Sequence, residues 1–205
     1  MSLDAVAALG EPVRRAVYEY VGASPEPVSR NDVAGAVGIG RTLAAFHLDK
    51  LVDAGLLEVA YGPRTGGPGA GRPPKLYRRS RAEYAVSIPP RDYRLLADVL
   101  ATAVEDLGAE PAVYAAAREQ GAKLAGGPLL ERLRALGYEP VTDPDAVVRL
   151  HNCPFHALAE AYPPLVCGLN LALLEGLVGD EGHVARLDPG PEGCCVTITS
   201  KNNSA

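Results

Sequence analysis

Apolar residues recur at helical spacing through the first part of the chain. Residues 3–21, 29–37 and 41–54 each place aliphatic side chains three or four positions apart, which is the pattern of amphipathic helices. Segment 38–40 (GIG) interrupts the pattern between the second and third of them, and Gly55 ends the third. The spacing therefore predicts a helix-turn-helix with a further helix packed behind it.

The pattern changes to strand alternation after these helices. Residues 56–61 (LLEVAY) alternate between two faces, residues 62–74 are rich in Gly and Pro, and residues 75–79 (KLYRR) suit a returning strand. A β-hairpin that directly follows a helix-turn-helix is a wing. Residues 1–81 are therefore predicted to form a winged helix-turn-helix domain.

The second half of the chain mixes both patterns. A long amphipathic helix is predicted over 91–107, and it serves either for dimerisation or as a core helix of the second domain. Further helices are predicted at 111–124 (with an interruption at Gly121), 128–136, 154–161 and 164–178, and strands at 138–142, 146–150, 184–188 and 194–199.

These elements define an α+β fold class with three regions. The N-terminal winged helix-turn-helix domain takes residues 1–81, and residues 82–109 supply a linker and the predicted dimerisation helix. Residues 110–205 form a smaller α+β effector domain that contains all of the cysteines.

Charge separates the two halves of the chain. Residues 1–81 hold eleven Lys and Arg against eight Asp and Glu, whereas residues 82–205 hold nine against seventeen. Six basic residues and no acidic residue lie between Gly62 and Arg81. A basic reading head on an acidic body is typical of a DNA-binding protein whose second domain has another task.

The outward face of helix 41–54 and the basic hairpin carry the candidate DNA contacts. The candidates for base contact, opposite the apolar stripe, are Arg41, Thr42, Ala45 and Phe46. The candidates for phosphate or minor-groove contact are Arg64, Arg72 and Lys75.

The stretch TLAAFHLDKLVDAGLLE (42–58), followed by GRPPKLY (71–77), resembles winged-helix bacterial repressors of the ArsR/DeoR-like group. The resemblance covers roughly residues 1–81. It implies that the second helix of the pair reads the major groove and that the hairpin touches the DNA backbone. The expected partners are thus a double-stranded DNA operator and a second copy of the chain, because a homodimer doubles the half-sites read.

Four cysteines lie after residue 152, and none lies earlier. Cys153 precedes a predicted helix and Cys167 lies early in the next one, where a helix N-terminus lowers the pKa of a thiol. Cys194 and Cys195 open the last predicted strand and would point to opposite faces, with Cys194 toward the core. Clustered thiols in a cytosolic chain favour metal ligation or redox chemistry, although buried apolar packing is also open.

The stretch NCPFHALAEAYPPLVCGLN (152–170), with a Cys about 27 positions later, resembles the effector half of SufR-type repressors, whose pattern runs N-C-P-[FY]-x3-A…P-x-V-C…C. The resemblance implies that three cysteines, here Cys153, Cys167 and Cys194 or Cys195, hold an iron–sulfur cluster of the [4Fe-4S] or [2Fe-2S] type. The protein would then be a redox-sensing repressor.

A cluster normally has four protein ligands, so one more is needed. The candidates are His156 one helical turn after Cys153, His151, the extra cysteine, or a small external thiol. Zinc is the alternative metal, because three cysteines and a histidine also suit a tetrahedral zinc site.

Other classes of protein find less support. No stretch approaches the ~20 apolar residues of a membrane span, and the N-terminus has no signal-peptide pattern, so we expect a cytoplasmic protein with no membrane partner. The catalytic motifs of hydrolases, metalloproteases and nucleotide-binding enzymes are missing from the sequence, which predicts no enzyme. Two hypotheses stay open: a regulator with a small organic effector pocket and zinc or no metal, and a thiol switch that uses Cys194 and Cys195.

Overall fold

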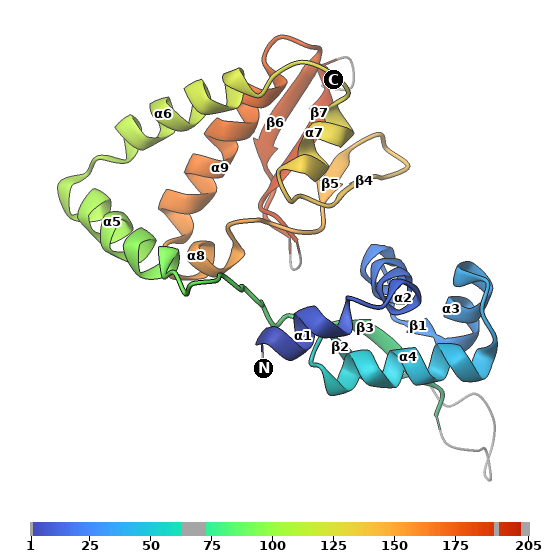
Figure 1. Ribbon diagram of the computed structural model, residues 1–205. Coiled ribbons are helices and arrows are strands. Elements are labelled where there is room, and N and C mark those ends of the chain that lie inside the picture. The colour runs from blue at the N-terminus through green and yellow to red at the C-terminus, as the bar shows by residue number, and fades with distance from the viewer. Residues whose placement is uncertain (1, 63–72, 191–192, 202–205) are drawn as a thin grey trace. The chain divides into compact units, whose positions relative to one another are not determined.

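The computed structural model describes residues 2–62, 73–190 and 193–201 (Figure 1). These residues fall into two compact units, Met1–Arg91 and Asp92–Ala205, and each is described by itself. The long helix predicted over 91–107 is grouped with the second unit. None of the described helices has the length and apolar content needed to cross a membrane.

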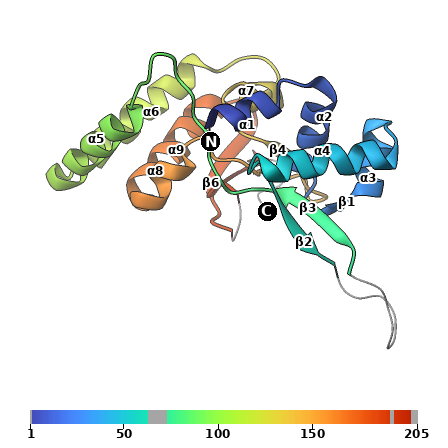
Figure 2. The ribbon, with the colours of Figure 1, turned by 60° about the horizontal axis from the view of Figure 1, so that its bottom comes forward.

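The first unit is a winged helix-turn-helix, as the sequence predicts. Its elements are α1 (Ser2–Ala8), α2 (Pro12–Ala23), β1 (Val28–Ser29), α3 (Arg30–Val37), α4 (Arg41–Asp53), β2 (Leu57–Tyr61) and β3 (Lys75–Arg79). Strands β2 and β3 pair in antiparallel fashion beside α4, and β1 adds to β3, which gives the order β1-β3-β2 (Figure 2).

Local sequence sets the ends of α3. Ser29 begins the helix through a capping box, in which its hydroxyl accepts the backbone N–H groups of Asn31 and Asp32 while the Asp32 carboxylate accepts the Ser29 N–H. Gly38 ends it in a left-handed conformation at φ 72°, which a side chain would disfavour. The chain then turns directly into α4, so the helix pair follows from its own capping residues.

One core joins α2, α3 and α4. Its fully buried members are spaced as the sequence predicts, and they are Val17, Val33, Ala44, Leu48 and Leu51. Because three of them lie along one side of α4, the polar side of that helix faces away from the core.

The second unit is an α+β structure. Its helices are α5 (Tyr93–Leu107), α6 (Glu110–Lys123), α7 (Leu129–Ala135), α8 (His156–Ala161) and α9 (Pro163–Val178), and its strands are β4 (Pro140–Thr142), β5 (Val148–Leu150), β6 (His183–Leu187) and β7 (Val196–Ser200). The sheet is antiparallel in the order β4-β5-β7-β6. Helix α9 lies between this sheet and α6 (Figure 1).

Two glycines let α6 and α9 touch backbone to backbone. A Cβ on Gly121 would lie 2.0 Å from the Leu173 carbonyl oxygen, and a Cβ on Gly176 would lie 2.0 Å from the Arg118 carbonyl oxygen. The prediction that Gly121 interrupts a helix is therefore wrong, because it lies inside α6 and serves close packing.

The last strand also begins later than the sequence predicts. Strand β7 starts at Val196, and Cys194 and Cys195 lie in the bend before it. Since strand alternation does not apply to a bend, the argument that the two thiols point to opposite faces does not hold here.

Candidate DNA interface and thiol cluster

The outward side of α4 carries the residues that the sequence assigns to base contact. Arg41, Thr42 and Phe46 are exposed, and Ala45 is half-buried. Leu43, which the sequence analysis does not single out, is exposed beside them. A helix that presents two long side chains and small residues to solvent can enter a major groove.

Lys75 begins β3 at the loop end of the hairpin, and its side chain binds α4. Its Nζ is 2.5 Å from Asp49 Oδ1, and the Tyr77 hydroxyl donates to the same oxygen at 3.3 Å. The hydrogen bond to Asp49 raises the pKa of Lys75. The structure thus gives this lysine an intramolecular partner that the sequence analysis missed. Arg64 and Arg72 lie outside the described residues.

The four cysteines from three separate segments meet in the second unit. Cys153 and Cys195 each lie close enough to Cys194, and Cys167 close enough to Cys195, to shift the pKa values of Cys153, Cys194 and Cys195. Cys194 is buried, and the other three are half-buried. The fold therefore brings together cysteines that lie far apart along the chain, which their spacing alone does not establish.

Backbone contacts hold the bend before β7 in place. Gly193 has φ 86°, and a Cβ there would lie 2.8 Å from the Leu150 carbonyl oxygen. The same oxygen accepts the Cys194 N–H at 2.8 Å. On the other side of the cluster, Asn152 Nδ2 donates to the Gly137 carbonyl oxygen at 2.6 Å. The end of β5 and the loop after α7 therefore position both sides of the cluster.

The Cys194 sulfur accepts several hydrogen bonds. The Cys153 and Cys195 thiols, the Val196 backbone N–H and the Asn170 amide donate to its sulfur, and they lower its pKa well below the usual range. The pKa of Cys153 is raised, because it donates to Cys194 and is partly buried. This corrects the expectation that a helix N-terminus lowers the pKa of Cys153.

Two buried polar residues support Cys194 from the core. Asn170 Nδ2 lies 3.0 Å from Cys194 Sγ, and the Tyr138 hydroxyl donates to Asn170 Oδ1 at 2.5 Å. Both side chains are almost fully buried. Burial, followed by the nearby thiols, raises the pKa of Tyr138, so its hydroxyl keeps its proton. The sequence analysis assigns no role to either residue, although a lone Asn in an apolar helix is a visible signal.

Neither candidate histidine joins the thiols. His156 is exposed, and its Nε2 lies 3.4 Å from Glu160 on the next turn of α8. His151 is exposed, and its backbone N–H donates to the Glu139 carbonyl oxygen. The cysteines therefore form a set of four sulfur donors without a histidine among them.

The chemistry of these donors fits a soft metal, although they are not arranged around a common point. Within residues 2–62, 73–190 and 193–201, no three His, Cys, Asp or Glu side chains form a group that could hold an ion as placed. The thiols instead interact in pairs, Cys153 with Cys194, Cys194 with Cys195, and Cys195 with Cys167. Thiolates are the preferred ligands of iron–sulfur clusters and structural zinc, so the donor set matches such a group in its chemistry.

Comparison with known proteins identifies the first unit alone. A family model for a helix-turn-helix domain matches residues 9–60, which run from before α2 into β2. No curated protein and no solved structure matches the chain. The family match and the winged fold together support the class of DNA-binding transcription regulators.

Proposed function

We propose that this protein is a dimeric DNA-binding repressor whose operator affinity is controlled by an iron–sulfur cluster held by Cys153, Cys167, Cys194 and Cys195. The observation that carries the proposal is the contact of four thiols from three segments within one unit. The exposed face of α4 supports the DNA-binding part.

Four sulfur donors match the needs of an iron–sulfur cluster better than three would. Clusters of both common types are bound by four cysteine thiolates, so the fourth ligand need not come from a histidine. A bound cluster would supply sensitivity to oxidants and to iron. Zinc is the second candidate, because four thiolates also make a closed tetrahedral zinc site.

The hollow beside Cys194 is too small for a typical organic effector. The hollow beside Cys194 has a volume of about 70 Å³. Its lining residues include Arg149, His151 and Asp188. Pockets for drug-sized organic ligands typically measure ~300–1,000 Å³. A site of this size suits small ions or water rather than an organic effector.

Helix α5 supports the dimeric part of the proposal. Its outward face exposes large apolar side chains, each more than half accessible: Leu95, Leu96, Val99, Leu100 and Leu107. Only Ala101 of this helix is buried. A second α5 would cover this face and place two reading helices on one palindrome. A monomeric mass in solution at micromolar concentration would contradict this part.

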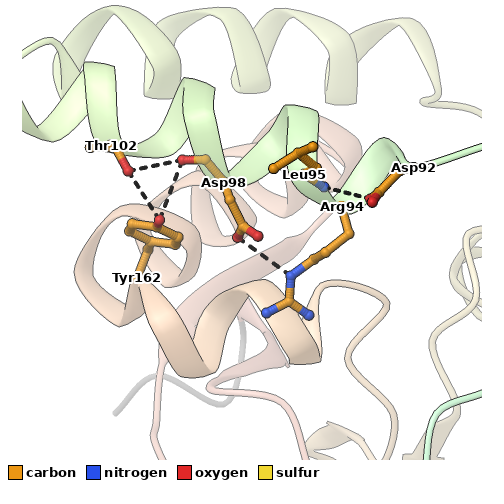
Figure 3. Close-up of polar contacts among 6 residues, drawn as sticks. All are labelled: Asp92, Arg94, Leu95, Asp98, Thr102 and Tyr162. Atoms are coloured by element: carbon orange, nitrogen blue, oxygen red, sulfur yellow. Dashed lines mark hydrogen bonds and ion pairs between the residues drawn. The ribbon is translucent and has the colours of Figure 1, made fainter.

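Tyr162 offers a route from the thiols to α5. It lies between α8 and α9, five residues before Cys167. Its hydroxyl lies 3.1 Å from Thr102 Oγ1 and donates to the Asp98 carbonyl oxygen at 3.3 Å (Figure 3). Movement of the start of α9 would therefore move α5, the proposed dimerisation helix. Control of DNA affinity requires an element with two states, and we assign that role to α5.

Metal analysis of protein made without oxygen tests the proposal. Wild-type protein should contain iron and acid-labile sulfide, and each single Cys-to-Ser variant should lose most of both. His156→Ala is the matched control, because it removes the exposed histidine and leaves the thiols in place. Stoichiometric zinc without sulfide would favour the second candidate. Full metal content in Cys153→Ser and Cys167→Ser would overturn the site.

A further inference from the structure

Helix α9 is apolar along most of its length, yet it buries one amide. Asn170 is 1% exposed and lies in the same helix as the buried Leu174 and Leu177. A buried amide is costly unless its hydrogen-bonding groups find partners. Both polar atoms of this amide have a partner, since Oδ1 accepts a hydrogen bond from Tyr138 and Nδ2 donates one to Cys194. The amide thus bridges a phenol and a sulfur in the core.

The phenol decides which end of the amide faces the sulfur. Tyr138 is buried and keeps its proton, so it acts as a donor and requires an oxygen opposite it. The Asn170 nitrogen must then point at Cys194 Sγ, which lies 3.0 Å away. A sulfur that receives an N–H is an acceptor, and a thiolate or a metal-bound sulfur accepts better than a thiol does.

We propose that Tyr138 and Asn170 are positioning residues of the metal site: the phenol orients the amide, and the amide donates to the Cys194 sulfur while that sulfur binds metal. This inference rests on the proposed function. Neither side chain touches the metal itself. Partners that hydrogen-bond to metal ligands fix ligand orientation, and their loss typically weakens metal binding 10–100-fold.

Zinc binding to metal-free protein under reducing, oxygen-free conditions tests this role. Asn170→Leu should bind zinc roughly 10–100-fold more weakly in competition with a chelator, and Tyr138→Phe should weaken binding in the same direction. Leu174→Val is the matched control, because it removes one buried carbon from the same helix and leaves every hydrogen-bonding group in place. Its zinc affinity should equal that of the wild type.

Cobalt substitution adds a readout that a merely structural role would not move. Asn170→Leu removes the N–H donor, and Tyr138→Phe removes the phenol that aims it at the sulfur. Either change raises the energy of the sulfur lone pairs, so the sulfur-to-cobalt charge-transfer band should move to longer wavelength in both variants. The double variant should bind zinc no more weakly than Asn170→Leu alone, because the phenol acts through the amide. Tyr138→Phe keeps the ring in the core. If Asn170→Leu does not fold, the zinc affinity and cobalt band of Tyr138→Phe alone test the positioning role.

Two contrary results are distinguishable. Tight zinc binding by wild-type protein together with unchanged affinity and an unchanged cobalt band in Tyr138→Phe and Asn170→Leu would overturn the positioning role and leave the proposed function standing. Failure of wild-type protein to bind zinc, cobalt or iron would overturn the proposed function and this inference with it.

Discussion

Asp49 is the residue at which the reading helix and the hairpin meet. Its carboxylate binds Lys75 and receives the Tyr77 hydroxyl, and both partners belong to β3. The same carboxylate places a negative charge beside the surface that would approach phosphates. Asp49 therefore holds the start of β3 against α4 and weakens the attraction of the wing for DNA at the same time.

Replacement of Asp49 by Asn should strengthen DNA binding. The change removes one negative charge and frees Lys75 for a phosphate, so the slope of log K against log salt should steepen by about one. Fluorescence anisotropy with a labelled duplex at several salt concentrations measures both quantities. Asp53→Asn is the control, because Asp53 pairs with Lys50 on the same helix. Equal or weaker binding with an unchanged slope would contradict the role of Asp49.

The capping residue Asp32 links the stability of the first unit to pH. The Ser29 backbone N–H, followed by its side chain, lowers the pKa of Asp32. A carboxyl whose pKa falls on folding stabilises fully above its unfolded value of about 3.9, and its contribution is lost as pH drops through the folded value. Denaturant unfolding should therefore show stability falling below about pH 4, and less steeply in Asp32→Asn. Equal pH profiles would contradict this.

At the scale of elements, the sequence predicts what depends on neighbours along the chain. Helix α4 and its outward residues follow from spacing and from Gly40 and Gly55 alone. The bend that carries Cys194 does not, because Gly193 owes its conformation to Leu150, which lies more than forty residues away. Asp49, the partner of Lys75, is likewise distant in sequence. The sequence therefore shows that residue 75 is basic, but it does not show that its charge is already paired within the protein.

The contact between α6 and α9 should be intolerant of added volume. A Cβ at Gly176 would meet the Arg118 carbonyl oxygen at 2.0 Å, so Gly176→Ala must separate two helix backbones. We expect the free energy of unfolding to fall by about 1–3 kcal/mol or more. Gly35→Ala in α3 is the control, because nothing lies within 4 Å of its Cβ, and it should stabilise by about 0.5–1 kcal/mol. Chemical denaturation compares them, and equal effects would contradict the packing argument.

The Tyr162 hydroxyl links α5 to the junction between α8 and α9. Tyr162→Phe removes the contacts to Thr102 and Asp98 but keeps the ring (Figure 3). It should reduce the ratio of operator affinities with and without metal, where about 1 kcal/mol of coupling corresponds to roughly fivefold. Tyr114→Phe is the control. The Tyr114 hydroxyl lies on α6 and donates to the Pro164 carbonyl oxygen at the start of α9, so its loss does not remove a hydrogen bond to α5. An unchanged ratio in Tyr162→Phe would contradict the route.

At the scale of the whole molecule, the chain joins a helix-turn-helix unit to an α+β unit that carries the cysteines. The family match covers residues 9–60, within the first unit. The function of the second unit must therefore be argued from its side chains. Four thiols that meet from three segments, with one sulfur supported by a buried amide, constitute that argument.

The resemblance to SufR-type repressors predicts which cysteines matter, but not how they are held. Cys153 and Cys167 match the family pattern in order and in rough spacing, with one extra residue between them, and both lie close to the Cys194–Cys195 pair. From the sequence, Cys194 and Cys195 are alternative third ligands. Both lie in the bend before β7, and that geometry depends on tertiary contacts that no local pattern encodes.

The central claim is that the inorganic group held by the thiols controls DNA binding, and one titration tests it most directly. A DNA duplex is first selected from a random pool by wild-type protein. Its dissociation constant is then measured with one oxygen-free protein preparation, before and after a chelator removes the metal from the protein under reducing conditions. The account predicts that the dissociation constant changes by about 5–150-fold and that Cys194→Ser shows no change. Equal affinity of the metal-loaded and metal-free wild-type protein would contradict it.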